Sequence, residues 1–207
     1  MRIIIVSVLL LFNITAFTQM ENRFEGGVLL GLASTQINGD GYAGYNRVGW
    51  TAGFFLERQY KDRWTFLTEL AYITKGSLQP PNTLSGNFNT LKIRLNYVEM
   101  PFIFKYHIKK FRVMAGPSIG FLVGEKQFRD GVEAVGLDVI IGPFKKFEIS
   151  SQIGVEYEVG EKSMLSWRYS TSMLPVANRL IQDPTSIFGF AGGSYNQLMT
   201  ISLRVKI

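Results

Sequence analysis

The sequence has no cysteine and a single histidine, His107, among its 207 residues. Without cysteine there is no disulfide framework, no thiolate metal site and no lipid anchor attached through an N-terminal cysteine. Beyond the N-terminus there is also no run of 18 apolar residues, the length at which a helical membrane span becomes a candidate. These absences exclude a disulfide-rich secreted domain, a thiolate zinc protein and a helical membrane protein.

Charge is sparse, and this bears on partners and chemistry. Charged residues make up 18% of the chain, and the 22 lysines and arginines are scattered although the net charge is +6. A nucleic-acid-binding domain gathers its basic residues on one face, so we expect no nucleic-acid partner. His107 has no serine and acid arranged around it as in a hydrolase, and Asp130, Glu133 and Asp138 are too loosely spaced for a calcium site. We therefore expect no enzymatic activity, no cofactor and no metal.

The N-terminus carries the pattern of a secretory signal peptide. Met1-Arg2 is a short positive start, residues 3–14 are an apolar stretch, and Ala16 and Thr18 place small residues at the −3 and −1 positions of a cleavage site. The sequence predicts a signal peptide over residues 1–18 and one domain over residues 19–207. The alternative is a buried N-terminal helix or strand.

The most regular pattern lies at the C-terminus, in residues 195–207. Every second residue from Tyr195 to Ile207 is apolar except Gln197, whereas the residues between them are polar except Leu198. A period of two predicts a β-strand with one apolar and one polar face. Strands of globular proteins average about 5–6 residues, while a tilted strand that crosses a bilayer needs about 9–11. The length therefore favours a membrane-spanning strand.

Seven further segments alternate in the same way. They cover residues 24–33, 48–58, 64–75, 91–107, 111–123, 147–159 and 163–173. Connections after the second, fourth and sixth segments are short, and those after the first, third, fifth and seventh are long. Short periplasmic turns that alternate with long extracellular loops are typical of outer-membrane barrels. The sequence predicts an all-β fold, an eight-stranded antiparallel up-and-down transmembrane β-barrel located in the outer membrane of a Gram-negative cell.

One predicted strand, residues 91–107, changes phase. Ile93, Leu95 and Tyr97 share one face, but further along the apolar residues lie on the other face, beginning with Met100 and Phe102. One extra residue near 96–98 would shift the alternation, so we expect a β-bulge in this strand. Pro101 cannot donate to a ladder hydrogen bond and is expected close to that irregularity.

The two faces of the strands differ in chemistry. Lipid replaces a core around a membrane barrel, so the apolar face is predicted to point outward and the polar face inward. The polar face carries acids and bases that can pair in a narrow lumen, which we expect to be filled with side chains. The members of this predicted charge network include Glu25, Glu57, Glu69, Glu99, Lys105, Arg112, Glu156, Arg168 and Arg204. An aromatic girdle at the headgroup level is predicted from Trp50, Trp64, Tyr72, Tyr106, Trp167 and Tyr169.

One segment also resembles a known family. Residues 95–106, with Tyr97, Glu99, Pro101 and Lys105, resemble the Y-x-E-x-P-x-x-x-K strand of the PorT-like outer-membrane β-barrel proteins of Bacteroidota. The following strand with Ala115-Gly116-Pro117 is similar to the next strand of that family. The resemblance implies an integral outer-membrane protein. The founding type is associated with gliding and type IX secretion, but no motif here selects that role.

Two functional hypotheses follow. In the first, the barrel contacts outer-membrane lipid, and the loops contact the exterior or another envelope protein through apolar residues. These residues are Tyr42, Phe128, Phe144, Ile187, Phe188 and Phe190. In the second, the chain is a secreted soluble β-barrel whose apolar faces line a cavity for an apolar ligand. Sequence does not define the oligomeric state.

Overall fold

The computed structural model describes residues 24–39, 44–81, 88–135, 142–178 and 193–207. The predicted signal peptide lies outside these residues, as do Tyr42, Ile187, Phe188 and Phe190 of the loops. Where the structure describes the chain, no helix is long and apolar enough to cross a membrane.

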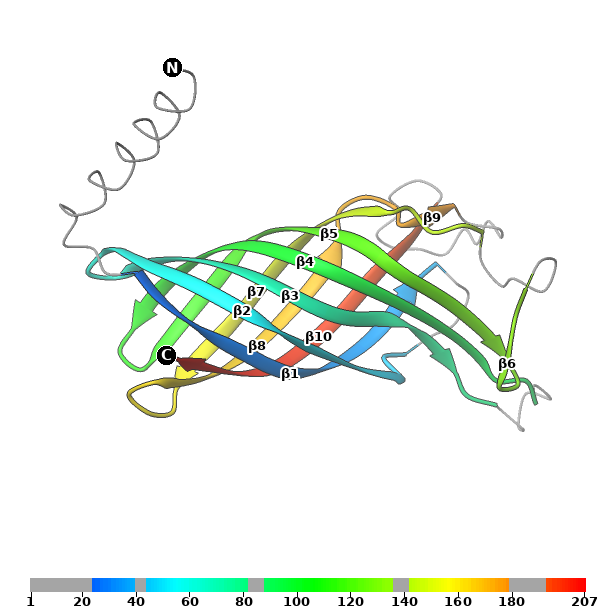
Figure 1. Ribbon diagram of the computed structural model, residues 1–207, viewed down its shortest axis with the longest axis horizontal. Coiled ribbons are helices and arrows are strands. Elements are labelled where there is room, and N and C mark those ends of the chain that lie inside the picture. The colour runs from blue at the N-terminus through cyan, green and yellow to red at the C-terminus, as the bar shows by residue number, and fades with distance from the viewer. Residues whose placement is uncertain (1–23, 40–43, 82–87, 136–141, 179–192) are drawn as a thin grey trace, which may run out of the picture.

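The described chain forms a closed ring of eight long antiparallel strands (Figure 1). The strands are β1 (Phe24–Asn38), β2 (Arg47–Lys61), β3 (Trp64–Gln79), β4 (Leu91–Ile108), β5 (Phe111–Arg129), β7 (Phe147–Glu158), β8 (Ser163–Ser172) and β10 (Gly193–Lys206). Two short strands, β6 (Val132–Glu133) and β9 (Ala177–Asn178), pair with β5 and β10 beside the ring. Each long strand pairs with its neighbour in sequence, and β1 pairs with β10 to close the barrel. The predicted fold class is confirmed.

The strand bounds agree with the prediction to within three residues at the end with the short connections, here called the turn end. At the opposite loop end, several strands run further than predicted. β1, β3 and β5 were expected to end at Ala33, Lys75 and Val123, but they continue to Asn38, Gln79 and Arg129. Residues 74–79, 91–96 and 124–129 form a protruding sheet of β3, β4 and β5 that extends beyond the other strands (Figure 1). Alternation of apolar residues cannot mark these extensions, because both faces there carry polar residues.

The predicted phase change in β4 is wrong. Burial alternates without interruption along β4, so Ile93, Leu95 and Tyr97 point into the barrel. A register shift does lie between Asn96 and Tyr97, where the bulge was expected, but the extra residue is on β5. Asn96 pairs with Gly124 and Tyr97 with Leu122, which leaves Val123 unpaired with β4. Pro101 lies in regular register with Ser118. The apolar residues of β4 lie inside the barrel near the loop end and outside it near the turn end, because the interior is apolar near the loop end and charged near the turn end.

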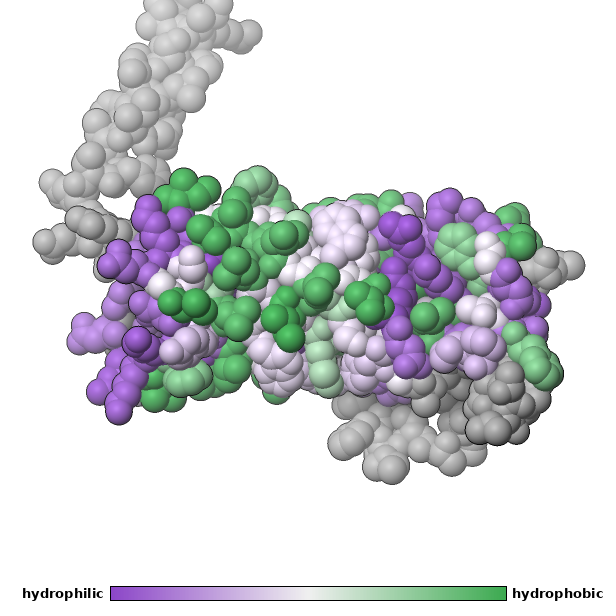
Figure 2. Space-filling model, turned by 90° about the horizontal axis from the view of Figure 1, so that it is seen from below, coloured by the Kyte–Doolittle hydropathy of each residue, from purple (hydrophilic) through white to green (hydrophobic). Residues whose placement is uncertain are grey.

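Residues on the two faces of each strand differ in exposure as predicted for a membrane barrel. In β10, Ile201 and Leu203 are 57% and 46% exposed on the outside, whereas Arg204 is 0% exposed inside. Figure 2 shows the outer surface as an apolar band between two hydrophilic ends. The core of this protein is therefore a lumen filled with side chains, and the apolar surface surrounds it.

Candidate functional site

A dense group of ion pairs fills the turn-end half of the interior. Lys105 Nζ lies 2.7 Å from Glu57 Oε2 and 3.0 Å from Glu156 Oε1. Arg112 Nη1 donates to the same Glu156 oxygen at 2.9 Å, and Arg204 pairs with the other. Glu156 thus accepts from three cations contributed by β4, β5 and β10, and it ties strands on different sides of the ring together.

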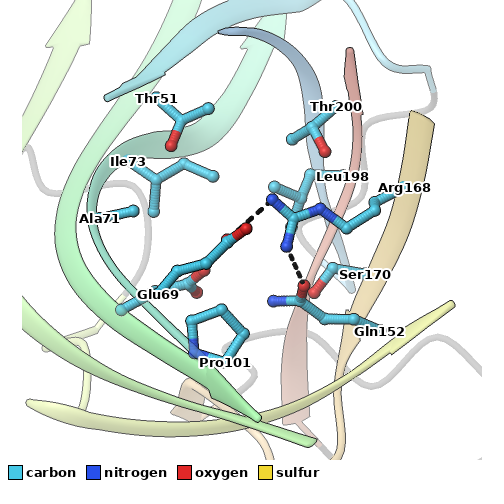
Figure 3. A pocket seen from close by; sticks show the side chains of 11 residues that line it. Thr51, Glu69, Ala71, Ile73, Pro101, Gln152, Arg168, Ser170, Leu198 and Thr200 are labelled. Atoms are coloured by element: carbon cyan, nitrogen blue, oxygen red, sulfur yellow. Dashed lines mark hydrogen bonds and ion pairs between the residues drawn. The ribbon is translucent and has the colours of Figure 1, made fainter. Parts of the chain in front are cut away.

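Glu69 extends this group toward the middle of the barrel. Its two oxygens lie 3.0 Å from Arg204 Nη2 and 2.9 Å from Arg168 Nη2. Arg168 Nη1 also donates to Gln152 Oε1 at 3.2 Å, so its guanidinium lies between an acid and an amide (Figure 3). Gly154 makes room for this side chain, because a Cβ there would lie 2.7 Å from Arg168 Cγ.

A small cavity lies next to the ion pair between Glu69 and Arg168, and Thr51, Pro101 and Thr200 are among its other lining residues. Its volume is ≈ 20 Å³, which suits about one water molecule. Side chains therefore fill the lumen at this level, and they leave neither an open channel nor space for an organic ligand.

A second polar group lies nearer the loop end. Lys75 pairs with Glu99, and its Nζ lies 3.0 Å from Glu148 Oε1. Ser172 Oγ donates to Glu148 Oε1 at 2.7 Å, and Asn196 Nδ2 donates to Oε2 at 3.0 Å. One cation thus serves two carboxylates here, and neutral donors supply the remaining hydrogen bonds.

An apolar cluster covers this second group at the loop end, and we call it the apolar cap. Its members come from strands and from two loops: Ala33, Ile37, Ile73, Ile93, Leu95, Tyr97, Phe144, Val176, Ala177 and Leu198. Phe144 was predicted to offer contact surface in a loop. It is instead buried in the apolar cap, because the main chain of its loop is held by a hydrogen bond from Lys145 N to Val176 O.

The structure places the predicted charged residues at different depths. Glu57, Glu69, Glu99, Lys105, Glu156, Arg168 and Arg204 are buried in the interior. Arg112 is half-buried, and Glu25 is exposed at the turn-end rim, where it pairs with Lys206. Glu148, which the sequence placed among the inward charges, is also buried. Lys75 is buried as well, but it was not counted among the paired charges. Its position in the inward phase of β3 was the signal that could have identified it.

The predicted aromatic residues lie on the outer face, some near the loop end, some near the turn end and one in the middle. Trp50 packs on Tyr72 near the loop end, with ring centroids 5.0 Å apart. Trp64 packs on Tyr106 near the turn end, also at 5.0 Å. Tyr169 is half-buried and pairs with Met199, toward the loop end. Trp167 departs from both levels, because it pairs with Ile201 and Val155 in the middle of its strand.

The residues that carry the PorT-like resemblance share one physical property. Tyr97, Glu99, Pro101 and Lys105 lie at odd positions of β4, and all four are buried in the interior. Glu99 and Lys105 belong to the two polar groups, and the Tyr97 ring centroid lies 4.9 Å from Lys75 Nζ. The residues of this motif are spaced by multiples of two because they all lie on the inner, packed face of one strand.

His107 lies at the turn end of β4. Its Nε2 is 2.7 Å from Thr65 Oγ1 across the β3–β4 ladder. Among the described residues, no three histidines, cysteines or carboxylates are placed to hold a metal ion.

A closed antiparallel ring with an apolar outside and an ion-paired inside defines the class of membrane β-barrels. The family model described as "Outer membrane protein beta-barrel domain" matches residues 12–178, and the chain belongs to this family. A search of curated proteins gave no match.

Two solved structures match most of the chain. Neisserial surface protein A matches with a TM-score of 0.53 and 11% identity, over 88% of this chain and 97% of that chain. Ail, the attachment invasion locus protein of Yersinia pestis, solved with the heparin analogue sucrose octasulfate, matches with a TM-score of 0.49 and 11% identity, over 91% and 100%. At this identity, the likeness to Neisserial surface protein A concerns the fold alone.

Proposed function

We propose that the chain is exported through an N-terminal signal peptide and works as a non-enzymatic, integral outer-membrane protein with a closed interior. Its turns lie in the periplasm, and its loop end faces the outside and serves as a contact surface. The observation that carries this proposal is the direction of the side chains in β10: Ile201 and Leu203 point outward while Arg204 is buried. Such a surface is stable against hydrocarbon and unfavourable in water.

The second hypothesis, a soluble barrel with an apolar ligand inside, has no support in the geometry. Its apolar faces would line the interior, yet the outward phase of every long strand is apolar. Side chains, charged in the turn-end half and apolar in the cap, fill the place of the ligand.

We further propose that the chain belongs to the PorT-like branch of the family. The inward-facing Tyr97, Glu99, Pro101 and Lys105 of β4 support this assignment. No role in gliding or secretion follows from these residues, since each has a structural partner or position inside the barrel.

Export, insertion and sidedness are tested together by expressing the full chain with its own N-terminus in a Gram-negative host. We expect the protein in the outer-membrane fraction, with faster gel migration before boiling than after. An epitope placed within residues 179–192 should be labelled on intact cells, whereas one placed between Lys109 and Lys110 should require permeabilised cells. A freely soluble protein, or the opposite labelling pattern, would refute the proposal.

A closed interior has its own measurement. In planar bilayers, we expect the inserted protein to show no steady ion conductance, because ion pairs and the apolar cap obstruct the lumen. Stable channel openings in the wild-type protein would contradict the closed interior without affecting the membrane location.

A further inference from the structure

Four cations gather at the loop end, beside the outer face of the protruding sheet. Arg94 of β4 lies directly across from Lys126 of β5 on one side and from Gly76 of β3 on the other. Lys92 lies two residues along β4 on the same face, and Arg47 begins β2 nearby. Lys92, Arg94 and Lys126 are exposed. We call these four residues the loop-end cation cluster.

Arg47 is the unusual member, because it is only 5% exposed. Its Nε and Nη1 have no hydrogen-bond partner in the part of the chain that the structure describes. The side chain passes next to Gly76, where a Cβ would lie 3.4 Å from Arg47 Cδ, and the like charge of Arg94 acts on it. A buried guanidinium beside a second cation is unfavourable unless an anion joins them.

The described carboxylates do not supply that anion. Glu133 pairs with Lys126 at 3.0 Å, and both side chains are about half exposed. Asp130 accepts from the main-chain nitrogen of Thr90 at 2.7 Å. Arg47, Lys92 and Arg94 form no ion pair with a carboxylate of the described residues, so no described acid neutralises these three charges.

The height of the cluster indicates which anion it meets. Trp50 and Tyr72 form the aromatic pair near the loop-end edge of the apolar surface, and Arg47 lies three residues beyond Trp50. Three residues span about 10 Å along a strand, or about 7 Å along the membrane normal at a tilt of about 45°. The headgroup region extends about 5–8 Å beyond the hydrocarbon, so Arg47 lies at the level of the headgroup phosphates, and Lys92, Arg94 and Lys126 lie on the protruding sheet further out.

We propose that the loop-end cation cluster binds the phosphate groups of a phosphorylated glycolipid in the outer leaflet. Arg94 supplies an exposed guanidinium suited to two-pronged contacts with phosphate oxygens, Lys92 and Lys126 act as point charges at the edge, and the buried Arg47 adds its charge behind them. The inference rests on the proposed orientation, in which the loop end faces outside.

Binding is measured on the purified full chain in zwitterionic detergent, by native mass spectrometry and by titration of tryptophan fluorescence, since Trp50 is close to the cluster. The probes are diphosphorylated lipid A, dephosphorylated lipid A and inorganic phosphate. We expect binding of the phosphorylated lipid, weakened about tenfold or more in the Arg47→Gln/Arg94→Gln double variant. A matched control, Lys109→Gln/Lys110→Gln, removes two cations from the turn end and should bind as wild type.

Three results would overturn the inference. These are equal binding of the dephosphorylated lipid, equal loss in the turn-end control, and inorganic phosphate bound as tightly as the lipid. Arg94→Gln alone serves if the double variant does not fold, because Arg94 is exposed; it should weaken binding and keep heat-modifiable migration. A wild-type protein that inserts into vesicles but binds no phosphorylated lipid refutes this inference alone, whereas failure to insert refutes the proposed function.

Arg47 gives an independent measurement that needs no ligand. Without lipid its charge is buried and has no carboxylate partner among the described residues, so Arg47→Leu should raise resistance to urea in detergent. A lower resistance would show that Arg47 already has a partner within the chain and would overturn its assignment as a ligand-binding residue.

Discussion

The two halves of the barrel interior are filled by different means. The turn-end half holds a connected group of charged side chains whose inner members are Glu57, Glu69, Lys105, Arg112, Glu156, Arg168 and Arg204. Glu25, Glu158 and Lys206 continue this group to the rim. The loop-end half holds Lys75 with Glu99 and Glu148, and it is covered by the apolar cap. The turn-end half pairs many ions with one another. The loop-end half holds few ions and buries apolar groups next to them.

The connections explain this difference. Short turns such as Lys109–Lys110 cannot reach into the lumen, so the strands themselves must fill the turn-end half with long side chains. The long connections at the other end supply Phe144 and Val176 from two separate loops. Loop length therefore decides whether an end of this barrel is filled by strand side chains alone or with help from loops.

The largest effect is expected at Glu156, on which the turn-end group depends. Glu156→Ala leaves Lys105, Arg112 and Arg204 without their common carboxylate. Removing one partner from a buried ion pair costs about 3–5 kcal/mol, and we expect at least the lower value here. Urea unfolding in lipid vesicles, followed by tryptophan fluorescence, measures the free energy of unfolding.

Glu158→Ala is the matched control. Glu158 lies on the same strand and also pairs with Arg112, at 3.3 Å, but its side chain is 41% exposed. Exposed ion pairs contribute about 0–1 kcal/mol. Equal losses from the two variants would mean that water reaches the turn-end group, and the contrast between the two halves would then disappear.

The apolar cap is tested by Phe144→Ala. A buried Phe→Ala substitution costs about 3–5 kcal/mol, and we expect a value near 3 kcal/mol because a loop can relax more than a strand. Phe88→Ala is the control, since Phe88 is a loop-end phenylalanine that is exposed; its substitution should change stability by under about 0.5 kcal/mol. If Phe144→Ala costs no more than the control, the loop adds nothing to the closure of this end.

Glu148→Gln should have a smaller effect at the loop end. Glutamine keeps an oxygen that accepts from Ser172, and Lys75 keeps its pair with Glu99. We expect a loss of about 1–2 kcal/mol in vesicle unfolding, the difference between a charged and a neutral hydrogen bond. A loss as large as that of Glu156→Ala would show that the two polar groups are equally sensitive, contrary to the comparison.

The sequence predicted the ring of eight strands because outward residues in contact with lipid keep an apolar alternation. The prediction failed where lipid no longer sets the pattern. Residues 124–129 of β5 carry polar residues on both faces and were assigned to a loop. Ile93, Leu95 and Tyr97 were assigned to the lipid-facing side because they are apolar, but they are buried inside the barrel. Apolar character alone does not distinguish a residue in the apolar cap from one in contact with lipid.

The candidate site was predictable as a set of residues but not as a set of partners. Glu69, Glu156 and Arg204 could be assigned to the inner face from period two alone. That Glu156 meets Lys105 and Arg204 depends on how strands are staggered around the ring, which no local pattern specifies. Arg47 was missed for a related reason: it is the first residue of β2 and was counted with the preceding loop.

The smallest effect on stability is expected outside the barrel, at the ion pair between Lys126 and Glu133. Both side chains are about half exposed, so Glu133→Gln should change the free energy of unfolding by under about 1 kcal/mol.

The same substitution frees Lys126 to contact an anion beside Arg94, so affinity for diphosphorylated lipid A should rise by a few-fold, whereas Lys126→Gln should lower it. Native mass spectrometry of both variants tests this opposite response. Unchanged binding in both variants would show that Lys126 does not belong to the loop-end cation cluster. The comparison with Glu156 would then concern stability alone, because an ion pair inside the lumen stabilises the fold whereas an ion pair at the surface adds almost nothing.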